Sequence, residues 1–220
     1  MAEQEDTRQR LLEAAGPLFA ERGFDGVSVR DITEAATFKG ARPSPAAVSY
    51  HFKGKDELYV EAVRHAAGSC AAAVPMPEWP AGVPARQRLR DFVGAMLARL
   101  LRPDVPAWHR LLIMRELTQP RHGACENLVR DFIRPAFEKL LGVLRDLVPA
   151  GTPIERLQLI GGSVVGQCLH YHHARHVIPL LVGQREGPAF TVDQLADHIT
   201  AFSLAAIKGL FGPGAKGEPR

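Results

Sequence analysis

The sequence predicts an all-α fold, and three observations support this prediction. Apolar residues recur every three or four positions through most of the chain, in segments bounded by Pro or Gly. No segment shows the sustained alternation of apolar and polar residues that a half-buried strand requires. With 46% hydrophobic and 23% charged residues, the 220-residue chain has the composition of an ordinary globular protein with room for two domains.

The first expected helix covers residues 7–22. Asp6 and Gln9 form a variant of the capping box that often starts a helix. Pro17 would remove one backbone hydrogen bond, so we expect a bend near Gly16 rather than a break, because the apolar face continues on both sides. This face consists of Leu11, Leu12, Ala15, Leu18 and Phe19.

A short helix is expected to follow Ser28, which is a good N-cap residue. Arg30 and Glu34 would lie on its outer face. Its buried face consists of Val29, Ile32, Ala35 and Ala36.

A second short helix is expected to open at Ser44 or Pro45, since Pro is favoured at the first helical position, and to end near Phe52. The small residues at its start, Ala46 and Ala47, would let the backbone approach the edges of DNA bases. Hydroxyl and imidazole groups at groove depth would come from Ser49, Tyr50 and His51. Two such helices are typical of a helix-turn-helix unit, whose second helix enters the major groove.

The connection between these helices departs from the usual helix-turn-helix pattern. It normally takes about four residues, whereas residues 37–44 are about twice as many. The loop either adds phosphate contacts or is a solvated insertion, and the sequence leaves both interpretations open. Between residues 37 and 55 no acidic residue opposes the basic residues Lys39, Arg42, Lys53 and Lys55.

Residues 7–65 resemble the DNA-binding region of TetR-family repressors, through RLLEAAGPLFAERGFDGVSVRDITEAA and AAVSYHFKGKDELYVEAV. Later segments resemble the CecR-type (CerR) C-terminal branch of that family, through LLIMRELTQP, FIRPAFE, VVGQCLHYHHAR and HITAFSLAAIKGL. The resemblance implies a regulator that binds a pseudo-palindromic double-stranded DNA operator as a homodimer and is released by a small-molecule effector of unknown identity. It implies base or phosphate contacts from Ser28, Arg30, Ala46, Ala47, Ser49, Tyr50, His51 and Lys55.

Charge and cysteine content narrow the classes of protein that fit. Net charge is +3, and residues 1–65 hold nine Lys or Arg against eleven Asp or Glu, so DNA affinity would depend on the local arrangement of charge. Three widely separated cysteines without CxxC spacing predict neither a disulfide framework nor a zinc site. We expect a cytoplasmic protein with no cofactor, and no membrane partner, since the chain has no long uncharged apolar run.

Four prolines in residues 75–84 mark the expected domain boundary. We expect a helix-turn-helix DNA-binding domain over residues 1–54, a connecting helix over 55–74, a helical effector-binding and dimerisation domain over 75–211 and a disordered tail over 212–220. The connecting helix is followed by five expected helices over residues 86–101, 105–118, 126–147, 153–174 and 192–210. The last two are long, apolar and rich in small residues, which favours a two-fold four-helix interface.

An effector site would need a large apolar pocket with a few polar groups. Its candidates are Trp108, Met114, Arg115, Glu116, Phe137, Cys168, Tyr171 and His172. The competing interpretation is an ordinary core role for Trp108, Met114 and Phe137, and an interhelix salt bridge for Arg115 and Glu116. A regulator without an effector, acting constitutively, is a further alternative.

The histidine cluster at residues 170–176 suggests an opposing class, a helical-bundle metalloenzyme. His172 and His176 have the spacing of metal ligands on one helical face. However, no Glu stands beside the first histidine, as a zinc-peptidase helix requires, and the chain shows no Gly-rich phosphate loop or paired carboxylates. We therefore expect no metal site and no enzyme, and assign His170, His172, His173 and His176 to a polar helix end or a dimer interface.

Overall fold

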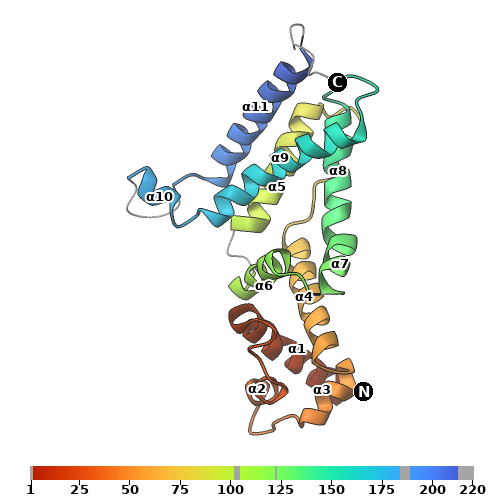
Figure 1. Cartoon of the computed structure of the whole chain (residues 1–220), viewed down its shortest axis with the longest axis vertical. Coiled ribbons are helices and arrows are strands. Elements are labelled where there is room, and N and C mark those ends of the chain that lie inside the picture. Colours follow the sequence, from red (N-terminus) through yellow and green to blue (C-terminus); the bar gives the residue numbers. More distant parts are fainter. Residues whose placement is uncertain (1, 102–104, 122, 184–188, 213–220) are drawn as a thin grey trace. The chain divides into compact units, whose positions relative to one another are not determined.

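The computed structural model describes residues 2–101, 105–121, 123–183 and 189–212, and its secondary structure in these ranges is almost entirely helical (Figure 1). The only β-type pairing among the described residues is an isolated antiparallel bridge between Phe38 and Ala41. The predicted all-α fold class is confirmed. Most of the expected tail, residues 213–220, lies outside the described residues.

The chain forms two compact units. The first comprises Met1–Ala73 and Pro103–Arg134, and the second comprises Val74–Arg102 and Pro135–Arg220. The first change of unit falls just before the proline-rich segment, where the sequence suggested a boundary. Residues 103–134 join the first unit because their helices pack on its N-terminal helices.

The first unit is built around α1 (Ala2–Arg22) and α4 (Lys55–Ala73), and α6 (Ala107–Thr118) packs against both. Buried side chains of α1 and α4, such as Phe19, Leu58 and Ala62, share one core with Leu112 of α6. The remaining elements of this unit are α2 (Val29–Ala35), α3 (Pro45–Phe52), α7 (Ala124–Leu128) and the π-helical turn η1 (Val129–Ile133).

Helix α1 differs from expectation at its start. It begins at Ala2, so the predicted start at residue 7 and the predicted capping box are wrong. Asp6 lies within the helix and pairs with Arg10 at 3.2 Å, and the Gln9 side chain donates to Glu13 at 2.8 Å. Pairs three or four residues apart stabilise a helix surface, and the Asp6–Arg10 pair lies before Leu11, the first residue of the apolar face that marked the helix in the sequence.

The second unit contains α5 (Ala85–Leu101), α8 (Arg134–Arg145), α9 (Ile154–His173), α10 (Ile178–Leu181) and α11 (Val192–Phe211). Helix α5 packs against both α9 and α11. Arg90 of α5 donates to Asp197 of α11 at 2.6 Å, and the His172 ring of α9 lies 2.9 Å from the Leu100 carbonyl of α5. The two C-terminal helices are thus both fixed to one central helix.

The single helix expected over residues 126–147 is interrupted. It consists of α7, η1 and α8, and the π-helical turn ends at Ile133, two residues before Pro135. Because Pro has no N–H to donate to the carbonyl four residues earlier, the regular hydrogen-bond pattern must change at this point.

Gly16 gives a test of packing in the first unit. A Cβ at this position would lie 2.2 Å from the Trp108 ring, too close for two non-bonded carbons, whereas at Gly68 of α4 the nearest atom would be 3.9 Å away on Phe132. We expect Gly16→Ala to lower the free energy of unfolding by about 1–2 kcal/mol, because overpacking exceeds the gain in helix propensity. Gly68→Ala is the matched control, and we expect it to stabilise the fold by about 1 kcal/mol. Urea unfolding of both variants measures the difference, and equal stabilisation would contradict the packing argument.

Candidate nucleic-acid interface

Helix α2 begins with a complete capping box. The Ser28 hydroxyl accepts from the Asp31 backbone N–H at 3.1 Å, and the Asp31 carboxylate accepts from the Ser28 backbone N–H at 2.7 Å. The hydrogen bond from the Ser28 hydroxyl is the main cause that lowers the pKa of Asp31. Ser28 and Arg30 are both exposed at this helix start, as a phosphate contact would require.

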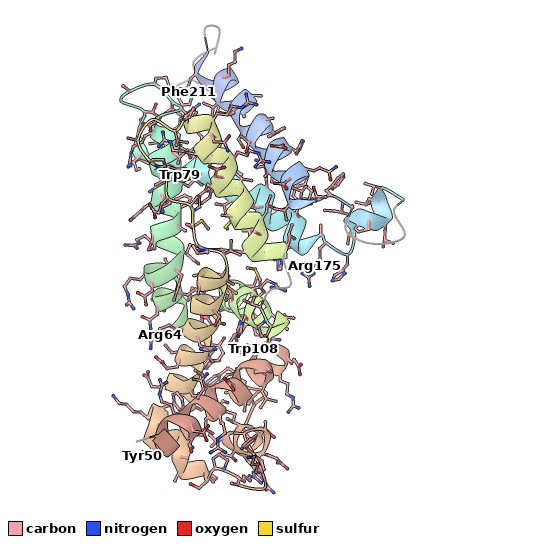
Figure 2. All side chains as sticks on the ribbon, turned by 180° about the vertical axis from the view of Figure 1, so that it is seen from behind. Tyr50, Arg64, Trp79, Trp108, Arg175 and Phe211 are labelled. Carbon is pink, nitrogen blue, oxygen red and sulfur yellow. The ribbon has the colours of Figure 1, made fainter. Side chains whose placement is uncertain are left out.

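Helix α3 has one buried face and one exposed face. Val48 and Phe52 are buried in the core of the first unit. Ala46 and Ser49 are exposed, and Tyr50 is 70% exposed on the outer side of the helix (Figure 2). The small start and polar middle predicted from the sequence therefore face outward. The two other candidates on this helix, Ala47 and His51, are half-buried.

The long connection between α2 and α3 folds into a tight hairpin. Phe38 and Ala41 exchange backbone hydrogen bonds of 3.1 and 2.9 Å, and the two residues between them have positive φ, 48° at Lys39 and 79° at Gly40. Positive φ at both central residues is what a two-residue hairpin turn of type I′ requires.

Arg42 anchors this hairpin to α2. Its guanidinium donates to the Arg30 carbonyl at 3.1 Å and to the Thr33 hydroxyl at 3.3 Å, and lies 4.0 Å from the Glu34 carboxylate. Arg42 was a candidate phosphate contact, and nothing in the sequence pointed to these partners within the protein.

Two lysines follow α3. Lys53 is the C-cap of the helix, exposed and left-handed with φ 59°. The Lys55 ammonium lies 4.0 Å from the centre of the Phe24 ring, so this side chain also takes part in packing at the start of α4. Both lysines lie in the segment from residue 37 to residue 55, which contains basic but no acidic residues.

Comparison with known protein families gives a match that includes α2 and α3. Residues 11–62 match the model of the bacterial regulatory proteins of the tetR family. Residues 85–207, more than half of the chain, match the C-terminal domain of the HTH-type transcriptional dual regulator CecR. The chain belongs to the TetR family of transcriptional regulators.

Several proteins are similar to this TetR-family regulator over most of its length. The HTH-type transcriptional repressor NicS of Pseudomonas putida is 26% identical over 95% of each chain. A TetR-like transcriptional regulator from Rhodococcus sp. RHA1 superposes with a TM-score of 0.59 at 20% identity, over 94% of this chain and 97% of that chain, which shows a shared fold. A second Rhodococcus regulator has a TM-score of 0.54 at 25% identity, over 91% and 95% of the two chains. The predicted family resemblance is confirmed.

A buried polar link within the first unit of this TetR-family regulator was not predicted from the sequence. Glu116 of α6 is 0% exposed and accepts from the Tyr59 hydroxyl of α4 at 2.7 Å and from the Arg121 backbone N–H at 2.7 Å. Burial, followed by the hydrogen bond to Glu116, raises the pKa of Tyr59 well above its usual value. The guanidinium of Arg121 lies 3.8 Å from the centre of the Phe24 ring, so α6 and the loop after it are tied to both α4 and the α1–α2 turn.

Four effector candidates lie in the first unit. Arg115 donates to the carbonyls of Ala20 and Glu21 at 3.2 Å, which closes the C-terminal end of α1. Glu116 and Arg115 therefore have separate partners. The side chains of Trp108 (labelled in Figure 2) and Met114 are both half-buried. The Trp108 ring packs on Gly16.

His109, next to Trp108, was not a candidate. It is buried, and desolvation is the main cause that lowers its pKa to about 4. Its Nδ1 has no hydrogen-bond partner among the described residues. Nothing in the local sequence distinguishes it from an ordinary helical histidine.

The other four effector candidates lie in the second unit. Phe137 of α8 packs on Gly161, where a Cβ would lie 3.0 Å from its ring. Cys168 is buried, and this burial raises the pKa of its thiol to about 12. Tyr171 is half-buried with its ring 6.4 Å from that of Phe190, and His172 is bonded to the Leu100 carbonyl.

The histidines of residues 170–176 do not share one helical face. Helix α9 ends at His173, so His176 lies in the turn beyond it, and the expected one-turn pairing with His172 is wrong. His172 is buried, whereas His170, His173 and His176 are exposed. Within the described ranges, no group of three His, Cys, Asp or Glu side chains comes together as a metal would require. Across the same ranges, no helix is both long enough and apolar enough to span a bilayer.

Proposed function

We propose that this TetR-family regulator is a repressor that binds a pseudo-palindromic operator as a homodimer and releases it when a small-molecule effector binds. The exposed face of α3 carries the proposal. It offers small residues at the helix start and then Ser49 and Tyr50, while Val48 and Phe52 hold the helix to the core. A buried side and an outward polar side of this kind are what a recognition helix in a major groove requires.

The assignment as a repressor rather than an activator is based on a similar protein. NicS, which matches this chain over 95% of its length, is named a transcriptional repressor. We assign no catalytic role, because recognition of DNA explains residues 28–55 in order and no other group of described residues offers comparable chemistry. The protein would act in the cytoplasm, where its operator is.

Two-fold assembly would use α9 and α11. Leu159 is 73% exposed on α9 and Phe202 is 58% exposed on α11, and Gly162 and Gly166 are exposed on α9. Exposed large apolar side chains beside small ones favour close packing against an identical surface. Two α3 helices one turn of DNA apart, or a multiple of it, would then explain a pseudo-palindromic site.

Effector response would act through the link between α6 and α4. Because Glu116 holds both Tyr59 and the loop at Arg121, a ligand that moves α6 would move α4 and the helix-turn-helix with it. A coupling of about 1–3 kcal/mol between effector and operator is enough for a useful switch. Thermal shift of the full chain against a compound panel tests this, and a regulator that responds to no compound yet binds its operator would be the constitutive alternative.

We predict that Tyr50→Ala reduces discrimination between operator and random DNA by about tenfold, since a base-edge contact is worth roughly 1–3 kcal/mol. Operator fragments selected from genomic DNA supply the substrate, and fluorescence anisotropy measures both affinities.

Lys55→Ala is the paired variant. It should weaken operator and random DNA alike and lower the salt slope by about one for each phosphate that is no longer neutralised. If both variants bind both duplexes as the wild type does, α3 does not read DNA and the proposed function fails.

A further inference from the structure

The hairpin between α2 and α3 is held in place by specific hydrogen bonds. It has two backbone hydrogen bonds between Phe38 and Ala41, and Arg42 fixes it to the Arg30 carbonyl and the Thr33 hydroxyl of α2. Only residues 42–44 separate it from α3, and it lies at the same end of the first unit as α2 and α3 (Figure 1). An anchored element of this kind can present side chains at a defined place.

The tip of the hairpin is exposed to solvent. Phe38 is 54% exposed, and a Cβ built on Gly40 would meet no atom within 4 Å. The Lys39 ammonium lies 5.3 Å from the centre of the Phe38 ring, and both side chains are exposed. A cation and an aromatic ring therefore project together from the tip.

Lys39 also has a strained backbone conformation, with φ 48°. Among the described residues, the only non-glycine positions with positive φ are Lys39 and Lys53, one on each side of α3. Gly or Asn adopts this conformation at lower cost, and Asn-Gly is the favoured pair for a type I′ turn. At Lys39 the chain keeps a long cationic side chain where Asn would fit the turn better, which points to a use for the charge.

The charge around the hairpin suits nucleic acid. No acidic residue occurs between residues 37 and 55, and Glu34 of α2, the acidic residue nearest in sequence before this stretch, lies 4.0 Å from Arg42. Residues 1–65 as a whole carry more acidic than basic groups. Each cation that faces the DNA therefore supplies a larger share of the electrostatic attraction to phosphates. A polyanion that already meets α3 is the partner this surface fits.

We propose that the hairpin is a second DNA contact, in which Lys39 pairs with a phosphate flanking the groove that α3 enters and Phe38 packs on the adjoining deoxyribose. Arg42 is the positioning residue that holds the hairpin against α2. This inference rests on the proposed function, and it extends the footprint of each protomer beyond the recognition helix.

The test compares Lys39→Asn with Lys39→Arg in the full-length protein. Asn relaxes the turn and removes the charge, whereas Arg keeps the charge. We expect Lys39→Asn to unfold at the same temperature as the wild type or higher, to bind operator about tenfold more weakly at low salt, and to lower the salt slope by about two per dimer. Lys39→Arg should bind as the wild type does. Arg86→Gln, which removes an exposed cation from α5 in the second unit, is the control for net charge.

Hydroxyl-radical footprinting supplies an independent readout. Phe38→Ala and Lys39→Asn should both expose the same deoxyriboses to cleavage, outside the segment protected by α3. Wild-type binding with an unchanged slope and footprint in both variants would overturn the hairpin contact and leave the proposed function standing. Weaker binding that follows a lower unfolding temperature would also overturn it, since the hairpin would then be structural. A wild-type protein with no affinity for any duplex would remove both proposals.

Discussion

Glu116→Leu is expected to lower the free energy of unfolding by about 3–5 kcal/mol, because it removes the acceptor of one buried and one partly buried hydrogen bond. The Tyr59 hydroxyl and the Arg121 backbone N–H both bond to this carboxylate at 2.7 Å. Leucine fills a similar volume and accepts neither bond. The buried Tyr59 hydroxyl would then be without an acceptor, and its desolvation would no longer be offset.

Urea unfolding measured by circular dichroism checks this value. Glu116→Gln keeps an oxygen acceptor and should cost only about 1 kcal/mol, and Tyr59→Phe should cost about 1–2 kcal/mol. Glu57→Leu, at an exposed position in the first turn of α4, is the matched control and should change stability by less than about 0.5 kcal/mol. A Glu116→Leu protein as stable as this control would show that the link between α4 and α6 contributes nothing.

The Glu116→Gln variant also tests whether the link between α6 and α4 transmits effector binding to operator affinity. If α6 moves α4 through Glu116, Glu116→Gln should keep operator affinity and reduce the shift that an effector causes in that affinity. Anisotropy titrations with and without the effector measure this coupling. An effector shift identical to that of the wild type would separate the structural role of Glu116 from any role in signalling.

The periodic parts of the fold were predictable from the sequence because their determinants are local. Helices α2, α3, α4, α5, α6, α9 and α11 follow apolar spacing and nearby stop signals, and Ser28 was identified as a cap by its own type and place. The start of α1 was misplaced because the residues before Leu11 are almost all polar and carry no apolar periodicity, although they are helical.

Interactions between distant residues were not predictable in the same way. Tyr59 and Glu116 are 57 positions apart, and neither residue type nor spacing pairs them in one sequence. The same holds for Arg42, whose basic character suggested a phosphate, whereas its guanidinium donates to two acceptors on α2. Helix α3 was predictable because its exposed polar face is formed by consecutive residues, but the hairpin before it needed the backbone geometry of Lys39 and Gly40.

Phe202→Arg is expected to produce a monomer that binds the operator at least about a hundredfold more weakly than the wild type. Phe202 is 58% exposed on α11, and a buried guanidinium facing its own symmetry copy would lose solvation and meet a like charge. A monomer binds only one half-site at a time, so it loses the avidity of two linked recognition helices, which is worth roughly a hundredfold or more.

Analytical ultracentrifugation with operator anisotropy on the same samples measures both effects. Leu159→Arg, on α9, should behave in the same way, because its side chain belongs to the same proposed surface. Leu111→Arg is the matched control: Leu111 is also exposed and apolar, but lies on α6 in the first unit, and its replacement should leave a dimer with wild-type affinity. If Phe202→Arg and Leu159→Arg remain dimeric and bind operator normally, α9 and α11 are not the two-fold interface. If all three variants are monomeric, the assembly uses a wider surface than these two helices.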